Sequence, residues 1–230
     1  MHGTSDQKTP LFVDLDGTFI KSDTLYESFL IAIKQNPFII FKIFLWFAKG
    51  KMHLKSMLSQ YVQLPVNSLP LNQEFYSFLQ GEKRKREIIL ATASPKKYAS
   101  EFVTNYDIFS SFISTTENVN LKGKKKLNKI QQLSRKFSYA GNSHEDCDIF
   151  PFAEERYLVN PTTKAKRRSS KLSIDAIFDH KPFDFKILLK QLRIHQWLKN
   201  LLIFVPLLVS GSYKNPKLIV LSILGFVSFR

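Results

Sequence analysis

Residues 11–18 read Leu-Phe-Val-Asp-Leu-Asp-Gly-Thr, an apolar run that ends abruptly in acidic and turn-forming residues. The run predicts a buried β-strand that meets a turn at Gly17. Side chains alternate along an extended chain, so Asp14 and Asp16 can point to the same side while Leu15 is buried on the other. Two carboxylates this close repel each other unless a proton or a cation lies between them. The stretch therefore indicates a site for a hard divalent cation with oxygen ligands, and Mg2+ is the natural candidate.

These two carboxylates suit phosphoryl transfer. A carboxylate held beside magnesium can attack phosphorus to give an aspartyl-phosphate, and a neighbouring carboxyl can protonate the leaving oxygen. Gly17 lets the backbone approach a phosphate and Thr18 supplies a hydroxyl, although Asp-Gly-Thr is also common at ordinary turns. Further polar residues follow in chain order and strengthen the interpretation: a hydroxyl at Thr92 or Ser94, then Lys126, then Gly141-Asn142-Ser143 followed by Asp146.

Strand and helix patterns alternate along the rest of the chain. Short apolar runs predict further buried strands at residues 88–91, 112–115 and 157–159. Apolar residues at helical spacing predict helices over residues 24–36, 38–49, 54–61, 72–79 and 126–137. This order predicts an α/β fold in which helices cover both faces of a parallel sheet. In such sheets, sites lie beyond the carboxyl ends of the strands, where the polar residues fall.

The four motifs together resemble those of the haloacid dehalogenase (HAD) superfamily. They are, in chain order, residues 13–18, residues 91–94, Lys126 and residues 141–146. The resemblance covers roughly Leu11–Pro161, and the motifs are specific as a set although each is weak alone. It implies a Rossmann-like HAD core with a helical cap inserted after the first strand. It also implies Mg2+-dependent hydrolysis of a phosphorylated small molecule.

The resemblance assigns roles to the first two motifs. Asp14 would be the nucleophile and a metal ligand. Asp16 would be the general acid and base and would bind the metal through its backbone carbonyl. A hydroxyl at Thr92 or Ser94 would hold the phosphoryl group, and we prefer Thr92 without excluding Ser94.

The later motifs supply a cation and the remaining metal ligands. Lys126 would neutralise the charge of the nucleophile and the phosphoryl group, and it is preferred because it begins the helix with apolar periodicity. Its competitors are Lys122, Lys124 and Lys125. Asn142 and Asp146 would complete the metal site. The family's last motif usually opens with Gly-Asp, whereas this chain has the neutral Asn142, which would hold Mg2+ less strongly than a carboxylate.

The expected HAD-like domain spans residues 9–163, with a helical cap over about residues 19–86. Such caps close over small substrates and exclude water. Within the cap, the run Phe38–Phe47 is apolar on nearly every face. The core of the cap is our preferred interpretation, and an interfacial membrane helix is the alternative, because the run is shorter than the ~20 residues needed to span a bilayer.

The net charge of +15 is concentrated towards the C-terminal end. Residues 164–182 form a basic segment that we predict to be a linker, and lysines and arginines continue to Lys199. This is the positive-inside pattern of a cytoplasmic segment before a membrane insertion. Since no basic groove with interleaved aromatic residues and no helix-turn-helix pattern accompanies the charge, we do not expect nucleic-acid binding. The single cysteine, Cys147, excludes an internal disulfide, and the polar N-terminus lacks the apolar core of a secretory signal.

Residues 183–230 resemble the beginning of a UbiA-type polyprenyltransferase, particularly the branch that acts on polyprenyl phosphates. The resemblance rests on the pattern Arg193-x-x-Gln196-Trp197-x-Lys199-Asn200 before the apolar runs 201–209 and 218–229. It implies an incomplete membrane domain of apolar helices, lipid contact through this segment, and a HAD-like domain on the cytoplasmic side of the inner or plasma membrane. It also makes polyprenyl phosphate a candidate partner. The family's Asp-rich motifs are absent, so prenyl transfer by this chain alone is not expected. Alternatively, the full-length protein transfers a prenyl group to an aromatic or phospho-sugar acceptor, and the HAD module only binds or regulates.

Overall fold

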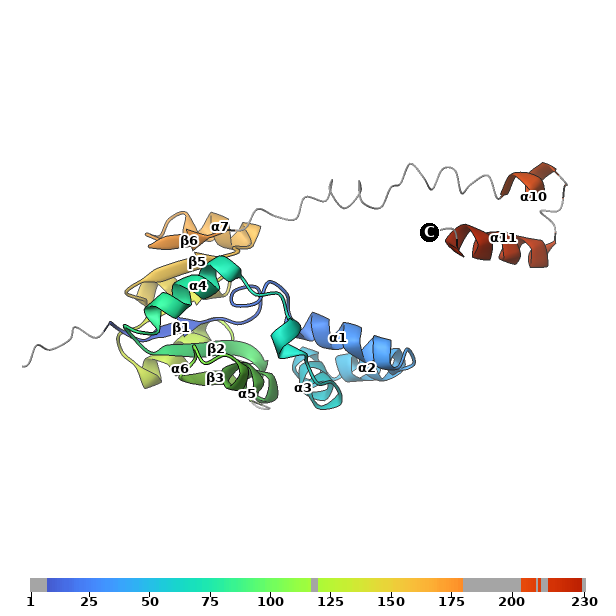
Figure 1. Cartoon of the computed structure of the whole chain (residues 1–230). Helices are drawn as coiled ribbons and strands as arrows, with labels where there is room; N and C mark the ends of the chain where they lie inside the picture. Colours follow the sequence, from blue (N-terminus) through green and yellow to red (C-terminus); the bar gives the residue numbers. More distant parts are fainter. Residues whose placement is uncertain (1–7, 117–119, 180–203, 210, 212–214, 229–230) are drawn as a thin grey trace, which may run out of the picture. The chain divides into compact units, whose positions relative to one another are not determined.

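The computed structural model describes residues 8–116, 120–179, 204–209, 211 and 215–228 (Figure 1). The chain divides into two compact units, residues 1–180 and residues 181–230. The first unit contains a parallel sheet with helices. The motif at residues 193–200 lies outside the described residues.

Six parallel strands form one sheet in the order β3-β2-β1-β4-β5-β6. Their bounds are β1 Leu11–Val13, β2 Ile88–Pro95, β3 Ser111–Thr115, β4 Ser138–Gly141, β5 Arg156–Val159 and β6 Ala176–Phe178. The strand β1 lies inside the sheet, where Val13 pairs with Leu90 of β2 and Ala140 of β4. The predicted α/β class with a parallel sheet is confirmed.

Alternate side chains of β1 enter two separate cores, one on each face of the sheet. Leu11 and Val13 pack in a core that includes residues of α4 and α5, whereas Phe12 packs in a core that includes residues of α6 and α7. Since both faces are covered, β1 is apolar throughout, as strands of buried parallel sheets are. The bounds of these helices are α4 Gln73–Glu82, α5 Lys96–Asn105, α6 Lys124–Leu133 and α7 Thr163–Ser169. Short 3-10 turns lie at Val66–Ser68, Asp146–Asp148 and Phe150–Phe152.

Three helices form a separate helical lobe beside the sheet (Figure 1). They are α1 Thr24–Gln35, α2 Ile39–Ala48 and α3 Lys51–Tyr61. The side chain of Asp23 caps α1 by accepting hydrogen bonds from the main-chain N–H groups of Leu25 and Tyr26. The lobe has its own apolar cluster, formed by Ala32, Ile39, Ile43, Leu54, Leu58 and Val62.

The predicted cap of residues 19–86 is wider than this lobe. Phe19 before the lobe and the α4 residues Phe75 and Leu79 after it all belong to the core of the sheet. The apolar stripe of α4 faces the sheet, so that helix covers the sheet instead of joining the cap. Only about residues 24–62 of the predicted cap therefore form a lobe with an apolar cluster of its own.

The interpretation of Phe38–Phe47 as cap core is wrong for most of its side chains. Only Ile39 and Ile43 are buried against the neighbouring helices. The aromatic side chains of Phe38, Phe41 and Phe44 are exposed. One side of α2 closes the lobe, and the opposite side faces away from it.

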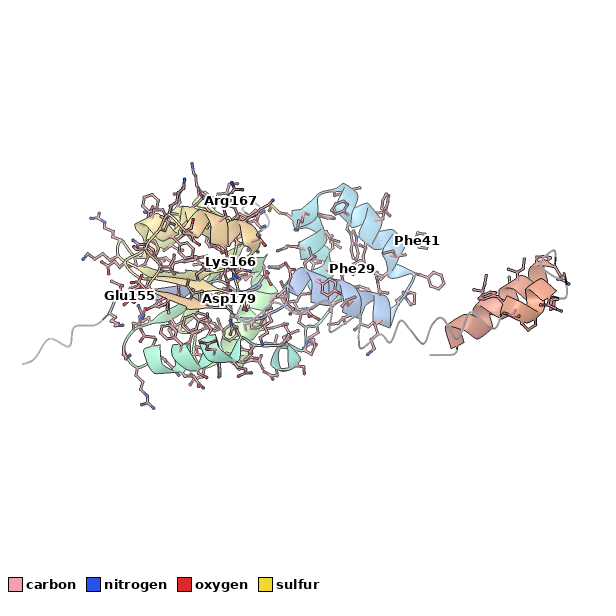
Figure 2. All side chains as sticks on the ribbon, turned by 90° about the horizontal axis from the view of Figure 1, so that it is seen from above. Phe29, Phe41, Glu155, Lys166, Arg167 and Asp179 are labelled. Carbon is pink, nitrogen blue, oxygen red and sulfur yellow. The ribbon has the colours of Figure 1, made fainter. Side chains whose placement is uncertain are left out.

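The prediction of a linker over residues 164–182, and of a domain end at residue 163, is also wrong. The helix α7 buries Ala165 in the core, and β6 extends the sheet by pairing with β5. Lys166 of α7 forms an ion pair with Asp179, at 2.5 Å between Nζ and Oδ2 (Figure 2). The basic composition concealed a short amphipathic helix, because the charged side chains lie on its exposed side.

The second unit contains two described helices, α10 Val205–Val209 and α11 Pro216–Ser228. Both are rich in apolar residues, and the described side chains of α11 between Leu218 and Leu224 are largely exposed. Among the described helices, none is both long and apolar enough to cross a lipid bilayer.

A buried arginine, Arg86, connects the end of α4 to the amino ends of β4 and β5. Its loss is expected to destabilise the first unit. Arg86, with 3% of its surface exposed, forms ion pairs with Glu82 and with Glu155, which Figure 2 labels. It also donates hydrogen bonds of 2.9 Å to the hydroxyls of Ser138 and Tyr157. We expect Arg86→Met to lower the free energy of unfolding by about 3–5 kcal/mol, because Glu82 and Glu155 both lose their ion pair with the buried guanidinium. Urea unfolding measures this.

The matched control is Arg84→Met, at an exposed position of the same segment, which should change stability by less than about 0.5 kcal/mol. The pH dependence gives a second check. Burial raises the pKa of Glu82, but hydrogen bonds from Lys85 and the charge of Arg86 outweigh it and lower the pKa. A carboxyl whose pKa is lowered by folding stabilises the folded state at a pH above its ordinary pKa. This stabilisation is lost as the pH falls through the pKa of the folded state. The difference between wild type and Arg86→Met should therefore shrink below about pH 4, and a constant difference would contradict the assignment.

Candidate active site

Five of the predicted site residues line one cavity at the carboxyl end of β1, whereas Thr92 and Ser94 are buried behind its wall. The cavity has a volume of about 180 Å3. Asp14 and Asp16 line it directly after β1, and Asn142 lines it directly after β4. Parallel neighbouring strands end at the same edge of a sheet, which is why residues so far apart in sequence meet here. The remaining lining residues are Asp23, Lys51, Lys55, Ala93, Lys122, Gly123, Lys126, Ser143, Glu145 and Asp146.

Lys126 is the lysine that reaches the nucleophile predicted from the sequence. Its Nζ lies 2.7 Å from Oδ1 of Asp14 and 3.4 Å from Oδ1 of Asp146. The apolar face of α6 buries the stem of Lys126, and only 3% of the residue is exposed. The neighbours Lys124 and Lys125 are exposed, and Lys122 lies 3.7 Å from Glu145. The preference for Lys126 thus agrees with the geometry.

Burial and charge together set the protonation of this pair. Loss of solvent raises the pKa of Asp14 to about 7, with Lys126 opposing the rise and Asp146 adding to it. Burial lowers the pKa of Lys126, but the charges of Asp14 and Asp146 outweigh it and raise the value to about 12. Lys126 is therefore charged at neutral pH. Around this buried pair, the cavity lining contains five carboxyl groups and four lysines.

Asp16 is held in a different environment from Asp14. Its Oδ1 accepts a hydrogen bond of 2.8 Å from the main-chain N–H of Thr24, and its Oδ2 accepts one of 2.7 Å from the hydroxyl of Ser94. Burial, followed by the charge of Asp23, raises the pKa of Asp16. A carboxyl that retains its proton more readily suits a general acid. The contact with Thr24 also links Asp16 to the start of α1 in the helical lobe.

The two hydroxyl candidates in β2 have different partners. Both Thr92 and Ser94 are fully buried, and the cavity wall between them is Ala93. The hydroxyl of Ser94 donates to Asp16. Thr92 Oγ1 accepts a hydrogen bond of 2.9 Å from the main-chain N–H of Ser94, and its own O–H donates to no group among the described residues. This favours Thr92 as a donor to a phosphoryl oxygen, while the role itself stays a prediction.

Asp146 is engaged at both of its carboxylate oxygens. Oδ1 accepts from Lys126 and, at 2.6 Å, from the hydroxyl of Tyr139. Oδ2 accepts from the main-chain N–H groups of Asn142 and Ser143 at 3.2 and 2.9 Å, and from the Ser143 hydroxyl at 2.6 Å. Burial raises the pKa of Asp146, but Lys126 and these hydrogen bonds outweigh it and lower the pKa. A carboxylate has about four lone-pair sites, so these donors occupy the positions at which Asp146 can accept hydrogen bonds. Asp146 therefore orients Lys126 and the turn that carries Asn142.

Glycine is required at two positions where the chain segments of the site approach closely. Gly17 has φ +77°, and a Cβ there would lie 2.1 Å from Nδ2 of Asn142. A Cβ on Gly141 would lie 2.7 Å from Cβ and Cγ of Asp146. Glycine therefore lets the turn after β1 lie against Asn142 and lets the end of β4 lie against Asp146.

The oxygen donors around the cavity fit a hard divalent cation. The described residues contain no group of three His, Cys, Asp or Glu side chains placed to hold a metal among themselves. An ion would therefore draw on Asp14, the main-chain carbonyl of Asp16 and the amide oxygen of Asn142. Mg2+ accepts such mixed oxygen ligands and retains several waters. The charges of Asp146 and Asp16 raise the pKa of Asp14, and a cation beside Asp14 would offset that repulsion. Direct ligation by Asp146 would replace hydrogen bonds that it already makes, so its predicted metal role stays a prediction.

Sequence reasoning missed several residues of the site. Tyr139 in β4 has an apolar strand context, and nothing in the sequence showed that its hydroxyl reaches Lys126 at 3.0 Å. Lys51 and Lys55 of α3 also line the cavity, and Lys55 Nζ lies 3.4 Å from the carbonyl of Ala93. Their spacing of four residues would place both on one side of a helix. The sequence did not show which side of that helix faces the site.

Comparison with known proteins identifies the fold. No family model matches the chain. A HAD family hydrolase from Salmonella enterica serovar Typhi is 13% identical, with a TM-score of 0.55, over 76% of this chain and 69% of that one. A putative phosphatase from Clostridium difficile is 12% identical, with a TM-score of 0.54, over 80% of this chain and 99% of that one. A predicted phosphoglycolate phosphatase from Haemophilus somnus is 15% identical, with a TM-score of 0.50, over 81% and 99%. The first unit therefore has a HAD-like fold.

A longer relative is also known. The uncharacterized protein y4nM of Sinorhizobium fredii is 31% identical over 228 residues, which is 97% of this chain and 44% of that protein. The chain thus spans less than half the length of this relative.

Proposed function

We propose that the first unit is a Mg2+-dependent phosphohydrolase that cleaves a phosphomonoester through an aspartyl-phosphate at Asp14. The observation that carries the proposal is the 2.7 Å contact between Lys126 Nζ and Asp14 Oδ1 on the wall of a small cavity. Asp16 lines the same cavity with a raised pKa. A nucleophile, a fixed cation and a proton donor are therefore within reach of one phosphoryl group.

When bound, Mg2+ would supply positive charge and orientation at the phosphoryl oxygens, held by Asp14, the carbonyl of Asp16 and Asn142. The protein's own groups perform the rest. Lys126 stays protonated and stabilises negative charge on Asp14 and on the phosphoryl group. Thr92 would fix a phosphoryl oxygen through its O–H, which donates to no group among the described residues. The helical lobe covers the cavity with Lys51 and Lys55.

The reaction proceeds in two displacements at phosphorus. In the first, a carboxylate oxygen of Asp14 attacks phosphorus, the bond from phosphorus to the ester oxygen breaks, and Asp16 gives its proton to that leaving oxygen. In the second, Asp16 takes a proton from water as the water oxygen attacks phosphorus. The bond between Asp14 and phosphorus breaks, and orthophosphate and the free Asp14 carboxylate are released. Asp16 ends protonated, as it began.

Release of phosphate by the full chain from a panel of phosphomonoesters, including sugar phosphates and a polyprenyl phosphate, tests this proposal. We expect release that stops on chelation and returns with added Mg2+. The variant Asn142→Asp should reach half-maximal rate at a lower Mg2+ concentration, because a carboxylate replaces a neutral ligand.

The control for added negative charge is Asn105→Asp, at the end of α5 and distant from the cavity lining, which should leave the Mg2+ requirement unchanged. Phosphate release that is unaffected by chelation would contradict the metal assignment. A folded chain that releases no phosphate from any member of the panel would favour the alternative, in which the HAD module only binds or regulates.

We also propose that this unit belongs to a membrane-associated protein of the UbiA type and acts on the cytoplasmic side of the membrane. The support is the resemblance of residues 193–200 to the beginning of such enzymes and the basic segment before them. In that setting a polyprenyl phosphate is a candidate substrate, and the C-terminal apolar residues would contact lipid. Prenyl transfer to an aromatic or phospho-sugar acceptor would then be an activity of the longer protein.

A further inference from the structure

The outer side of α2 presents large apolar side chains to solvent. We define the apolar face of α2 as Phe38, Phe41, Phe44, Leu45 and Phe47, whose exposed fractions are 77%, 69%, 72%, 63% and 59%. In Figure 2, Phe41 lies on the side of the helical lobe remote from the sheet, whereas Phe29 lies inside the lobe. Ile39 and Ile43 face the other way and are buried in the apolar cluster of the lobe. The exposed side chains are therefore not needed to hold the lobe together.

Such a concentration of exposed aromatic side chains on one short helix needs a partner. Single exposed apolar residues are normal on protein surfaces, but contiguous patches mark interaction sites. Ile40 on the same helix is also exposed. The patch lies on the lobe and is separate from the residues that line the cavity.

The charge around this face identifies the chemistry of the partner. No aspartate or glutamate occurs between Glu27 and Glu74. The same segment contains five lysines, of which Lys51 and Lys55 line the cavity. The other three, Lys34, Lys42 and Lys49, are exposed and lie outside the cavity lining. An apolar face in a segment with exposed Lys34, Lys42 and Lys49 and no acidic residue is complementary to an anionic lipid surface. There, rings enter between headgroups and ammonium groups contact lipid phosphates.

The dimensions of α2 decide how it meets a bilayer. The helix has ten residues, so it is roughly 15 Å long, whereas a bilayer core is roughly 30 Å thick. It can only lie in the interface plane. A second copy of the chain suits this face less well, since a symmetric contact would bring Lys42 and its neighbours against their own copies.

We propose that the apolar face of α2 docks on an anionic lipid bilayer, parallel to the membrane plane. The proposal concerns the helical lobe and does not depend on the catalytic assignment. It gives the lobe a membrane contact of its own, distinct from any that the C-terminal apolar residues make.

A probe placed on α2 separates this contact from binding through the C-terminal residues. The full chain has one cysteine, Cys147, which is buried, so a Phe41→Cys variant can be labelled at position 41 with an environment-sensitive fluorophore. We expect the label to shift to shorter emission wavelength and to be quenched by brominated lipid on vesicles of phosphatidylcholine with about 30% phosphatidylglycerol. The shift should weaken in high salt and on pure phosphatidylcholine.

The matched control is a label at Gln80→Cys, an exposed position on α4, which should stay in water on the same vesicles. In an unlabelled chain, Phe44→Ser with Leu45→Ser should weaken partitioning to these vesicles by at least about tenfold, because two exposed apolar side chains no longer enter the interface. A label at position 41 that stays in water on vesicle-bound protein overturns the proposal, as does absence of any vesicle binding. A shift that needs no vesicles and rises with protein concentration overturns it in favour of a second copy.

Discussion

Asp14→Asn is expected to abolish phosphate release, with a loss of roughly 10^4-fold or more, because the amide oxygen cannot act as the nucleophile of a phosphoryl transfer. The substitution preserves the shape of the side chain beside Lys126. Rates of phosphate release at saturating Mg2+ measure the effect. Rapid acid quench and mass spectrometry of the intact wild-type chain should show an acyl phosphate that the variant lacks.

The control is Asp107→Asn, which removes a fully exposed carboxylate that pairs with Lys83. It should retain the wild-type rate. Thermal unfolding of both variants separates loss of chemistry from loss of fold. A folded Asp14→Asn variant with the wild-type rate would exclude a covalent intermediate at Asp14 and with it the proposed mechanism.

The sequence was sufficient to predict the convergence of the four motifs, because parallel strands bring their carboxyl ends together. The run that ends at Asp14 could only be a buried strand, since apolar residues filled both of its faces. Lys126 could be distinguished from Lys124 and Lys125 because it begins the apolar periodicity of α6, which turns its side chain inwards.

What the sequence could not show depends on packing between distant segments. The Tyr139 hydroxyl reaches Asp146 only because β4 places the ring beside the 3-10 turn Asp146–Asp148. The helix α4 has the same kind of apolar stripe as the helices of the lobe, so its packing on the sheet could not be distinguished from a cap. In α7, basic residues on the exposed side outweighed the two buried residues, Ala165 and Ser169, and the segment was interpreted as a linker.

Burial of α2 was misjudged for a different reason. Ten residues with one lysine among apolar neighbours contain no polar side that would reveal which face is exposed. Hydrophobic periodicity assigns the apolar side to the core, and it fails when both sides are apolar. The structure resolves this, because Ile39 and Ile43, with Trp46 partly buried beside them, pack against the lobe, and the phenylalanine side chains remain outside.

Lys126→Met should both slow phosphate release and destabilise the first unit. We expect a decrease in rate of roughly 10^2- to 10^4-fold, since a fixed cation no longer offsets charge at Asp14 and the phosphoryl group. We expect a loss of about 3 kcal/mol in the free energy of unfolding, because the buried carboxylate of Asp146 loses its ion pair. Steady-state rates and urea unfolding measure the two effects.

The pH dependence distinguishes this role from a merely structural one. Lys126 lowers the pKa of Asp14, which is about 7 with the lysine in place. Without the lysine this pKa rises, and because the nucleophile is ionised only above its pKa, the rising limb of the residual activity should move to higher pH. The control Lys125→Met removes an exposed lysine of the same helix and should change neither rate nor pH profile. If Lys126→Met only lowered stability and kept the wild-type rate and pH profile, Lys126 would be a structural residue and not the cation of the reaction.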